Sequence, residues 1–301
     1  MKFLKPLTIL VPLIIVLAAL AAGMGLLYQT DGQPYTITNF RGETVTIQGH
    51  GLYQYDTVSS AAQMQANDLV TLVLGIPLLV FSFWLARKGS LRGQFLLSGT
   101  LAFYLYTYMS MSMNTAFNPL FLVYVALFGM SLYAFILSML GYDVQSLPAR
   151  FSDKLPRRAI AWVFIITAAF LTLAWVARIL QPVMNGTPPL LENTTTMVIQ
   201  AMDLVLIMPM AFLAAVLLLR RSAWGYLLAS VASMKFITMG IAVSLMGINM
   251  ARAGVPDSMA LVGMFIIVTI ANLILAALLL RAVLPSRQVK KQKAAFATKV
   301  Q

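Results

Sequence analysis

Eight apolar stretches, each long enough to cross a lipid bilayer, dominate this chain of 301 residues. A transmembrane helix needs about 20 apolar residues, because the hydrocarbon core is about 30 Å thick and a helix rises about 1.5 Å per residue. A mean hydropathy of +0.85, with 10% charged residues, excludes a soluble globular domain. The sequence therefore predicts an all-α polytopic membrane protein with eight transmembrane helices. They are expected at residues 7–28, 69–87, 94–113, 119–141, 159–180, 197–219, 223–249 and 258–281.

The basic residues gather on one side of these helices. With a cytoplasmic N-terminus, seventeen of the 21 lysines and arginines fall in inner segments, and only Arg41, Arg178 and Arg252 fall in outer ones. Membrane proteins show this bias in their cytoplasmic loops. It accounts for the net charge of +12 without a nucleic-acid partner, and it predicts that both termini are cytoplasmic. Trp175, near an outer helix end, is expected in the outer aromatic belt.

The first span has two interpretations. A basic start followed by an apolar run that ends in small residues is typical of a signal peptide. However, this run is longer than the apolar core of most signal peptides, so we expect an uncleaved anchor. Cleavage would leave seven spans in the same orientation. The chain has no cysteine, which excludes disulfides and thiolate metal sites.

Two segments of the chain align without a gap. Residues 77–93 and 209–225 each begin with proline and end with glycine sixteen positions later, and each carries a basic pair before that glycine. Asp-Leu-Val precedes both segments, beginning at Asp68 and at Asp203. Both copies cross in the same direction, which predicts a parallel internal repeat. The alternative is that proline, paired cations and glycine are common in short inner hairpins.

The repeat predicts two four-helix units, residues 1–141 and 159–282. A basic cytoplasmic linker, 142–158, joins them, and a basic cytoplasmic tail, 283–301, follows. The first unit carries a long outer segment, 29–67, in which β-branched and aromatic residues flank Arg41-Gly42 and predict a small β-hairpin. Two strands alone are marginally stable. We therefore expect the hairpin to pack as an extracytoplasmic cap on the helix ends.

Asp203 and Lys235 are the most informative polar residues, because ionisable side chains within a bilayer are costly unless they are paired or hydrated. Counting residues places both near the same depth, with Asn272 slightly deeper. One interpretation is a structural ion pair that locks three helices together. The other is a polar cavity that binds a ligand or relays protons.

Tyr104 and Tyr108 lie four residues apart in the third span and therefore share one helix face. Phenol groups at this spacing could line a ligand pocket and donate hydrogen bonds. The alternative is that they pack against a neighbouring helix. Either arrangement would direct them away from lipid.

His50, Asp56 and Asp68 are expected at the outer mouth of the bundle. His50 is the only histidine and lies between two glycines, so a turn position competes with a role in pH sensing or substrate contact. One histidine cannot supply the ligand set of a zinc or haem site. The sequence therefore indicates no metal and no cofactor. It also lacks the common nucleotide-binding, metalloprotease and serine-hydrolase motifs, so it provides no catalytic set.

A resemblance extends over most of the chain. The chain resembles a group of bacterial multi-span membrane proteins with no assigned activity in the segment from Gly49-His50-Gly51-Leu52-Tyr53 through Asp68-Leu-Val-Thr-Leu, in Gly75-Ile-Pro77 and in Gly89-Ser-Leu-Arg-Gly93. The segment from Asp203-Leu-Val through Trp224-Gly225-Tyr226 is similar to the second half of that group. The resemblance implies a bacterial inner membrane and transfers no functional residue.

Three classes of function are compatible with this sequence. The first is a transporter or binding protein for a small molecule or lipid, with a site between the two units toward the outer leaflet. The second is a sensor or an accessory subunit that docks on a membrane-protein partner. The third is a membrane enzyme. A hydrated cavity at Asp203 and Lys235 would favour the first class, a dry interior there the second, and a cleft joining the outer-mouth residues the third.

Overall fold

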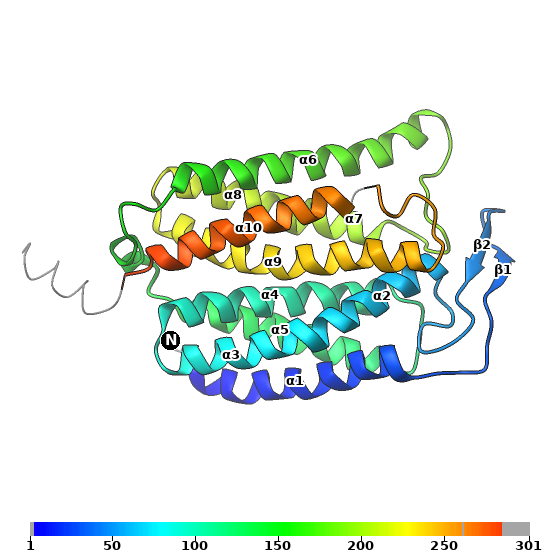
Figure 1. Ribbon diagram of the computed structural model, residues 1–301, viewed down its shortest axis with the longest axis horizontal. Helices are drawn as coiled ribbons and strands as arrows, with labels where there is room; N and C mark the ends of the chain where they lie inside the picture. The colour runs from blue at the N-terminus through cyan, green and yellow to red at the C-terminus, as the bar shows by residue number, and fades with distance from the viewer. Residues whose placement is uncertain (1–2, 261, 285–301) are drawn as a thin grey trace, which may run out of the picture.

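Long helices lie side by side along the longest axis of the molecule, and a two-stranded sheet covers one end (Figure 1). The computed structural model describes residues 3–260 and 262–284. Seven of its helices are long and apolar enough to cross a membrane. They are Leu4–Leu27 (α1), Val58–Arg87, Phe121–Leu140 (α5), Arg157–Met184 (α6), Val198–Leu219, Ala223–Arg252 (α9) and Val262–Ala282 (α10).

The remaining predicted span, the third along the chain at residues 94–113, coincides with helix α4, Leu91–Asn114, which has 24 residues but is more polar than the others. Serine, threonine and tyrosine side chains interrupt its apolar face, so it is not among the seven apolar helices. It packs against α3 (Ile76–Arg87), α5 and α9, and 14 of its residues are buried. Its polar groups therefore face protein rather than lipid, which is where polar side chains are tolerated in a membrane protein.

Two of the long helices contain a π-helical turn. Val58–Arg87 consists of α2 (Val58–Val70), the π segment η1 (Thr71–Gly75) and α3 (Ile76–Arg87). Val198–Leu219 consists of α7 (Val198–Met202), the π segment η4 (Asp203–Ile207) and α8 (Met208–Leu219). Each π segment ends two residues before a proline, Pro77 or Pro209. A proline inside a helix removes one backbone donor, and a wider turn lets the hydrogen-bond ladder resume around the gap.

The turns that follow α3 and α8 have the same close packing. A Cβ atom on Gly93 would lie 2.4 Å from Cβ of Leu85, and one on Gly225 would lie 2.3 Å from the backbone carbon of Leu217. Only glycine lets the second helix of each hairpin approach the first this closely. The two glycines occupy equivalent positions in the aligned segments.

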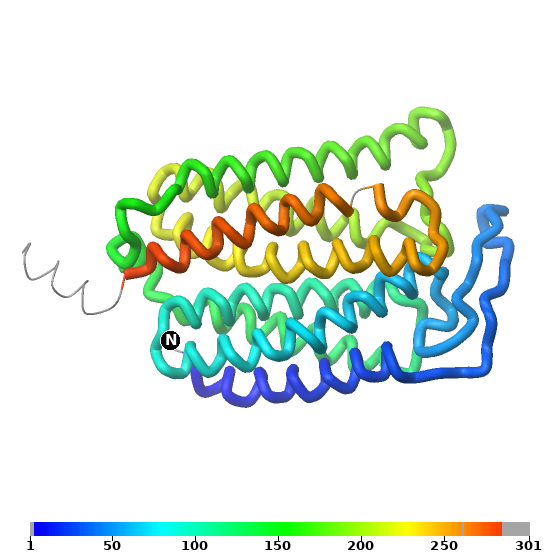
Figure 2. Tube along the Cα trace, in the orientation of Figure 1, coloured from blue at the N-terminus to red at the C-terminus, as the bar shows by residue number. Residues whose placement is uncertain are grey.

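The apolar core has two main parts. One gathers residues of α1, α3, α4 and α5, and the other gathers residues of α6, α8, α9 and α10. Short 3-10 turns, Val144–Ser146 (η2) and Pro148–Arg150 (η3), lie in the linker at the end of the bundle opposite the sheet (Figure 2). Phe151 of the linker stacks on Phe95 of α4 and contacts Tyr226 of α9. The linker therefore belongs to the second part of the core, which also includes Phe95 of α4.

The predicted hairpin is confirmed. Strand β1 (Tyr35–Thr38) pairs antiparallel with β2 (Thr44–Ile47), with Tyr35 opposite Ile47. Its tip contacts the loop between α6 and α7, where Arg41 donates hydrogen bonds to the carbonyl oxygens of Glu192 and Thr194. The cap therefore packs on this loop. The sequence predicted that the cap packs on the helix ends and did not predict this contact. The predicted basic tail beyond residue 284 lies outside the described residues.

Candidate functional site

Asp203, the first residue of the π segment η4, receives hydrogen bonds from two other helices. The hydroxyl of Tyr106 (α4) donates to Oδ1 at 2.6 Å, and the indole N–H of Trp175 (α6) donates to Oδ2 at 2.9 Å. Hydrogen bonds to an ionised acceptor are stronger than neutral ones. The carboxylate therefore ties together α4, α6 and η4.

Lys235 of α9 lies over the aromatic ring of the same tyrosine, Tyr106. Its ammonium nitrogen lies 4.3 Å from the ring centroid of Tyr106 and 5.6 Å from that of Phe236, and the residue is 3% exposed. The electron-rich face of an aromatic ring attracts a cation at these distances. Between Lys235 and Asp203, both within the described chain, there is no direct ion pair. Tyr106 links the two charges, through its ring on one side and its hydroxyl on the other.

A close helix crossing places Lys235 at this position. Gly99 of α4 faces Met234 of α9, where a Cβ atom on the glycine would lie 2.3 Å from Cβ of Met234 and 3.1 Å from the backbone nitrogen of Lys235. The missing side chain lets the two helices approach closely, a common use of small residues in membrane proteins. Tyr106 lies two turns farther along α4, on the side of α9. We call Tyr106, Trp175, Asp203 and Lys235 the inter-unit cluster, because they come from both of the four-helix units that the sequence predicts.

The inter-unit cluster is incompletely covered on the side of α6. Asp203 and Trp175 are half-buried, and the buried residues of α6 all lie at or before Ala168. One turn before Trp175, the hydroxyl of Thr172 is buried without a hydrogen-bond partner. Lys235 likewise has no acceptor for its ammonium group among the described residues. The cluster thus retains unused hydrogen-bonding capacity next to the part of α6 that is least packed.

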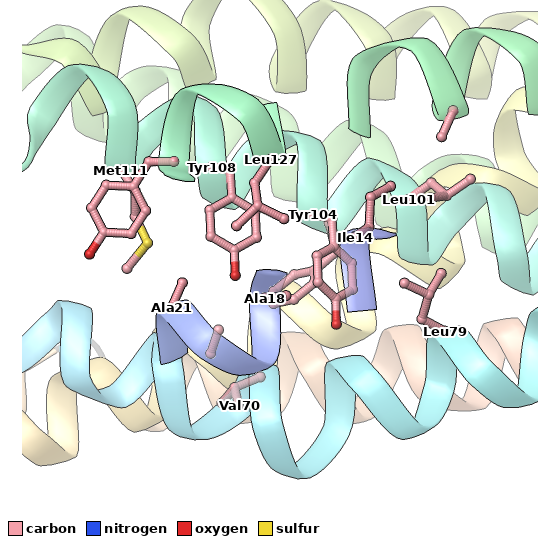
Figure 3. Close-up of a cluster of buried hydrophobic side chains, with 14 of the residues drawn as sticks. Ile14, Ala18, Ala21, Val70, Leu79, Leu101, Tyr104, Tyr108, Met111 and Leu127 are labelled. Atoms are coloured by element: carbon pink, nitrogen blue, oxygen red, sulfur yellow. The ribbon is translucent and has the colours of Figure 1, made fainter. Parts of the chain in front are cut away.

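Tyr104 and Tyr108 lie on the opposite face of α4 from Tyr106. They point toward α1, near Ala18 and Ala21 (Figure 3). Their ring centroids are 6.1 Å apart, and Tyr108 lies 6.4 Å from Tyr124 of α5. These two tyrosines pack near α1 and α5, so the structure separates them from Asp203 and Lys235 among the five predicted ligand-binding residues.

Asn272 is buried on α10 and donates a hydrogen bond to the carbonyl oxygen of Val268 in its own helix, at 2.9 Å. Its side-chain oxygen has no partner in the described chain. No hydrogen bond joins it to Asp203 or Lys235. The predicted cluster of three polar residues is thus reduced to a pair of charges bridged by an aromatic ring.

Of the three predicted outer-mouth residues, His50 has no hydrogen bond or ion pair with Asp56 or Asp68 in the described chain. His50 contacts Gln48 through Nε2 at 2.9 Å and lies in a turn whose glycines, Gly49 and Gly51, have φ angles of +74° and +71°. Asp68 is buried near the C-terminal end of α2, where it accepts a hydrogen bond from the Tyr53 hydroxyl at 2.6 Å. Within the described residues, no group of three potential metal-binding side chains is present.

Asp56 is also buried, in the loop before α2. It accepts a hydrogen bond from the backbone N–H of Ala116 at 2.9 Å. Burial raises the pKa of this carboxyl to about 7, because desolvation disfavours the charged form. Asp56 therefore titrates near neutrality.

Sequence reasoning missed Tyr106 and Trp175. Trp175 is a hydrogen-bond donor to Asp203, a role that its predicted place in the aromatic belt does not include. Tyr106 could have been considered, because it lies two residues from both Tyr104 and Tyr108 and so faces the other side of α4. No family model, curated protein or solved structure matches this chain.

Proposed function

We propose that this protein is an eight-span bacterial inner-membrane protein that binds, and as a transporter moves, a small molecule or lipid. The site is the inter-unit cluster, toward the outer leaflet, and both termini are cytoplasmic. Helix α4 is the eighth span, since its 24 residues would extend about 36 Å. The apolar helices and the distribution of basic residues support this arrangement.

Two structural similarities support duplication into two four-helix units. The π segments η1 and η4 have the same length and the same spacing to proline. The inner turns have equivalent glycines against equivalent positions of the preceding helix. Common hairpin composition explains the proline and the glycine separately, but it does not require a π segment at the same register. Helix α4 of the first unit then contacts η4 and α9 of the second unit.

The observation that carries the proposal is the buried ammonium of Lys235, which has aromatic contacts but no acceptor in the described chain. A charged side chain inside a membrane protein usually pairs or marks a ligand pathway. Here the nearest carboxylate already accepts two hydrogen bonds from Tyr106 and Trp175. Lys235 is therefore available to an anionic or strongly polar group of a ligand that enters beside α6.

The test is the identification of molecules retained by purified protein. Wild type, Lys235→Met and Asp203→Asn would be prepared in the same lipid nanodiscs and examined by native mass spectrometry. A control is Ser233→Ala, which alters a buried side chain two residues from Lys235 on the same helix. We expect a compound that wild type and the control retain and that both cluster variants lose. Identical contents in all four proteins would refute the proposed site.

A second candidate is an accessory subunit or sensor that docks through the cap. Phe40 at the hairpin tip is 72% exposed and Tyr55 is 57% exposed. Exposed aromatic residues outside the bilayer often mark protein interfaces. A photo-crosslinking residue at position 40 should yield a discrete protein adduct in native membranes, and one at the exposed outer position 257 should not. The absence of an adduct at position 40, or the same adducts at both, would refute this candidate.

A further inference from the structure

A second polar cluster lies inside the first unit, apart from the inter-unit cluster. It consists of Tyr53, Asp56, Asp68, Asn118 and Tyr124, which we call the outer carboxyl cluster. The hydroxyl of Tyr124 lies among the other four side chains. All five residues are at least nine-tenths buried. Its members come from the loop before α2, from α2, from the loop after α4 and from α5.

Three of these side chains keep a polar atom without a hydrogen-bond partner. They are Oδ2 of Asp56, the amide nitrogen of Asn118 and the hydroxyl of Tyr124. The remaining contacts are well formed. Oδ1 of Asn118 accepts from the backbone N–H of Leu120 at 2.9 Å, which determines the direction of its amide nitrogen. Buried polar atoms are usually paired, so three unpaired atoms in one cluster indicate a missing component.

The two carboxyls have no cationic partner. Within residues 3–260 and 262–284, neither Asp56 nor Asp68 is paired with an arginine, lysine or histidine. The titratable groups that face them are Tyr53 from the loop, Tyr124 from α5 and Tyr108 from α4, while α1 contributes Gly25. Two ionised carboxylates in such surroundings would repel each other without compensation. A positive charge must therefore accompany at least one of them.

The unpaired atoms favour a proton over a metal ion. Sodium, calcium and similar cations bind oxygen atoms, but the amide nitrogen of Asn118 is a donor and would repel a cation. A protonated carboxyl has an O–H group that can donate to the free hydroxyl oxygen of Tyr124. The carbonyl oxygen of the same carboxyl can accept a hydrogen bond from an amide. Tyr53 already donates to Oδ2 of Asp68 at 2.6 Å. This bond directs the Tyr53 hydroxyl to Asp68, whereas Oδ2 of Asp56 and the hydroxyl of Tyr124 have no hydrogen-bond partner in the described chain.

We propose that Asp56 and Asp68 share one exchangeable proton. When Asp56 holds the proton, Asp68 is a carboxylate that accepts a hydrogen bond from the hydroxyl of Tyr53. When Asp68 holds the proton, Asp56 is a carboxylate that accepts a hydrogen bond from the backbone N–H of Ala116. The outer carboxyl cluster is thus a proton-binding site that extends from the outer loop into the membrane-spanning part of the first unit.

Infrared difference spectroscopy of the full chain in lipid bilayers tests this site, because protonated carboxyls absorb separately from carboxylates. Wild type should show an acid band that decreases as the pH rises through about 7, the value to which burial raises the pKa of Asp56. Asp56→Asn should abolish this change. Asp68→Asn should shift its midpoint, because the two groups are coupled. The exposed carboxyl variant Asp31→Asn is the matched control and should leave the titration unchanged.

Tyr124→Phe provides a test that does not depend on altering a carboxyl. Its hydroxyl has no hydrogen-bond partner, so the variant should fold, as circular dichroism can verify. We expect the midpoint to shift in this variant as well. An acid band that titrates normally in Asp56→Asn, or a midpoint insensitive to both Asp68→Asn and Tyr124→Phe, would overturn the proposal. A midpoint that moves with sodium at constant ionic strength would also overturn it, by showing that a metal cation occupies the site.

Discussion

The hydroxyl of Tyr106 should stabilise the protein, whereas that of Tyr104 should not. Both residues lie on α4, two positions apart, and both are buried. Tyr106 donates a 2.6 Å hydrogen bond to Asp203, while the hydroxyl of Tyr104 has no partner in the described chain. Replacing each with phenylalanine removes one oxygen atom and keeps the ring. The pair therefore separates the value of the hydrogen bond from the value of the packing.

The expected magnitudes follow from these contacts. A hydrogen bond to a charged group contributes about 1.5–3 kcal/mol in soluble proteins, and hydrogen bonds between membrane helices contribute less, about 0.6–1.7 kcal/mol. For Tyr106→Phe we therefore expect a loss of about 1–2 kcal/mol, a roughly 5- to 30-fold change in the unfolding equilibrium constant. For Tyr104→Phe we expect no loss, or a small gain, because an unpaired hydroxyl is removed from the core.

Reversible unfolding in mixed detergent micelles, followed by circular dichroism, measures both variants against wild type. Trp175 reports on the same site, because its indole should lose part of its fixed environment in Tyr106→Phe. Its fluorescence can be isolated in a background without the other three tryptophans. Equal destabilisation by the two substitutions would refute the assignment of the bridge to Tyr106. A larger loss in Tyr104→Phe would instead favour that residue as the functional tyrosine.

Three other predictions concern the turn, the cap and the titration of Asp56. Gly93→Ala should destabilise the protein by about 1–3 kcal/mol, because the new Cβ would overlap α3, whereas Gly129→Ala meets no atom within 4 Å and should be tolerated in unfolding experiments. Arg41→Met should speed hydrogen exchange in residues 185–197, because it removes the contacts with Glu192 and Thr194; the same change at the exposed Arg252 should not. Because the pKa of Asp56 is raised when folded, the folded state binds more protons between about pH 4 and 7, so the free energy of unfolding should fall as the pH rises through that range. Asp56→Asn should flatten this dependence, and an unchanged slope would contradict it.

The helices and turns depend on short-range features of the sequence. Within a bilayer, every backbone polar group must be satisfied inside its own helix, so an apolar run of sufficient length specifies a helix by itself. The seven apolar helices were predictable for this reason, and so was the β-hairpin on either side of Arg41-Gly42. The proline positions were also visible in the sequence. Their consequence, a π segment before each, was not, because a proline can be accommodated in several ways.

The rotation of α4 about its axis shows why the site was only partly predictable. This helix carries tyrosines on both faces, with Tyr104 and Tyr108 on one and Tyr106 on the other. Hydropathy cannot choose between the two faces, because both are buried in protein. The choice depends on the neighbours of α4, especially the close crossing with α9 at Gly99. The contact of Lys235 with Tyr106 depends on that crossing, and the hydrogen bond from Tyr106 to Asp203 depends on the packing of α4 against α7.

The sequence by itself determined that the chain forms apolar helices, where its β-hairpin lies and which buried charges require an explanation. Those properties arise from local backbone hydrogen bonding and from the cost of placing charge in a bilayer. Only the tertiary structure decided how the charges are compensated. Lys235 and Asp203 are joined through Tyr106 because helices distant in the sequence meet at particular rotations and depths. Asp68 is joined to Tyr53 because the loop before α2 folds back on that helix. Such contacts depend on packing between helices, which no single segment specifies.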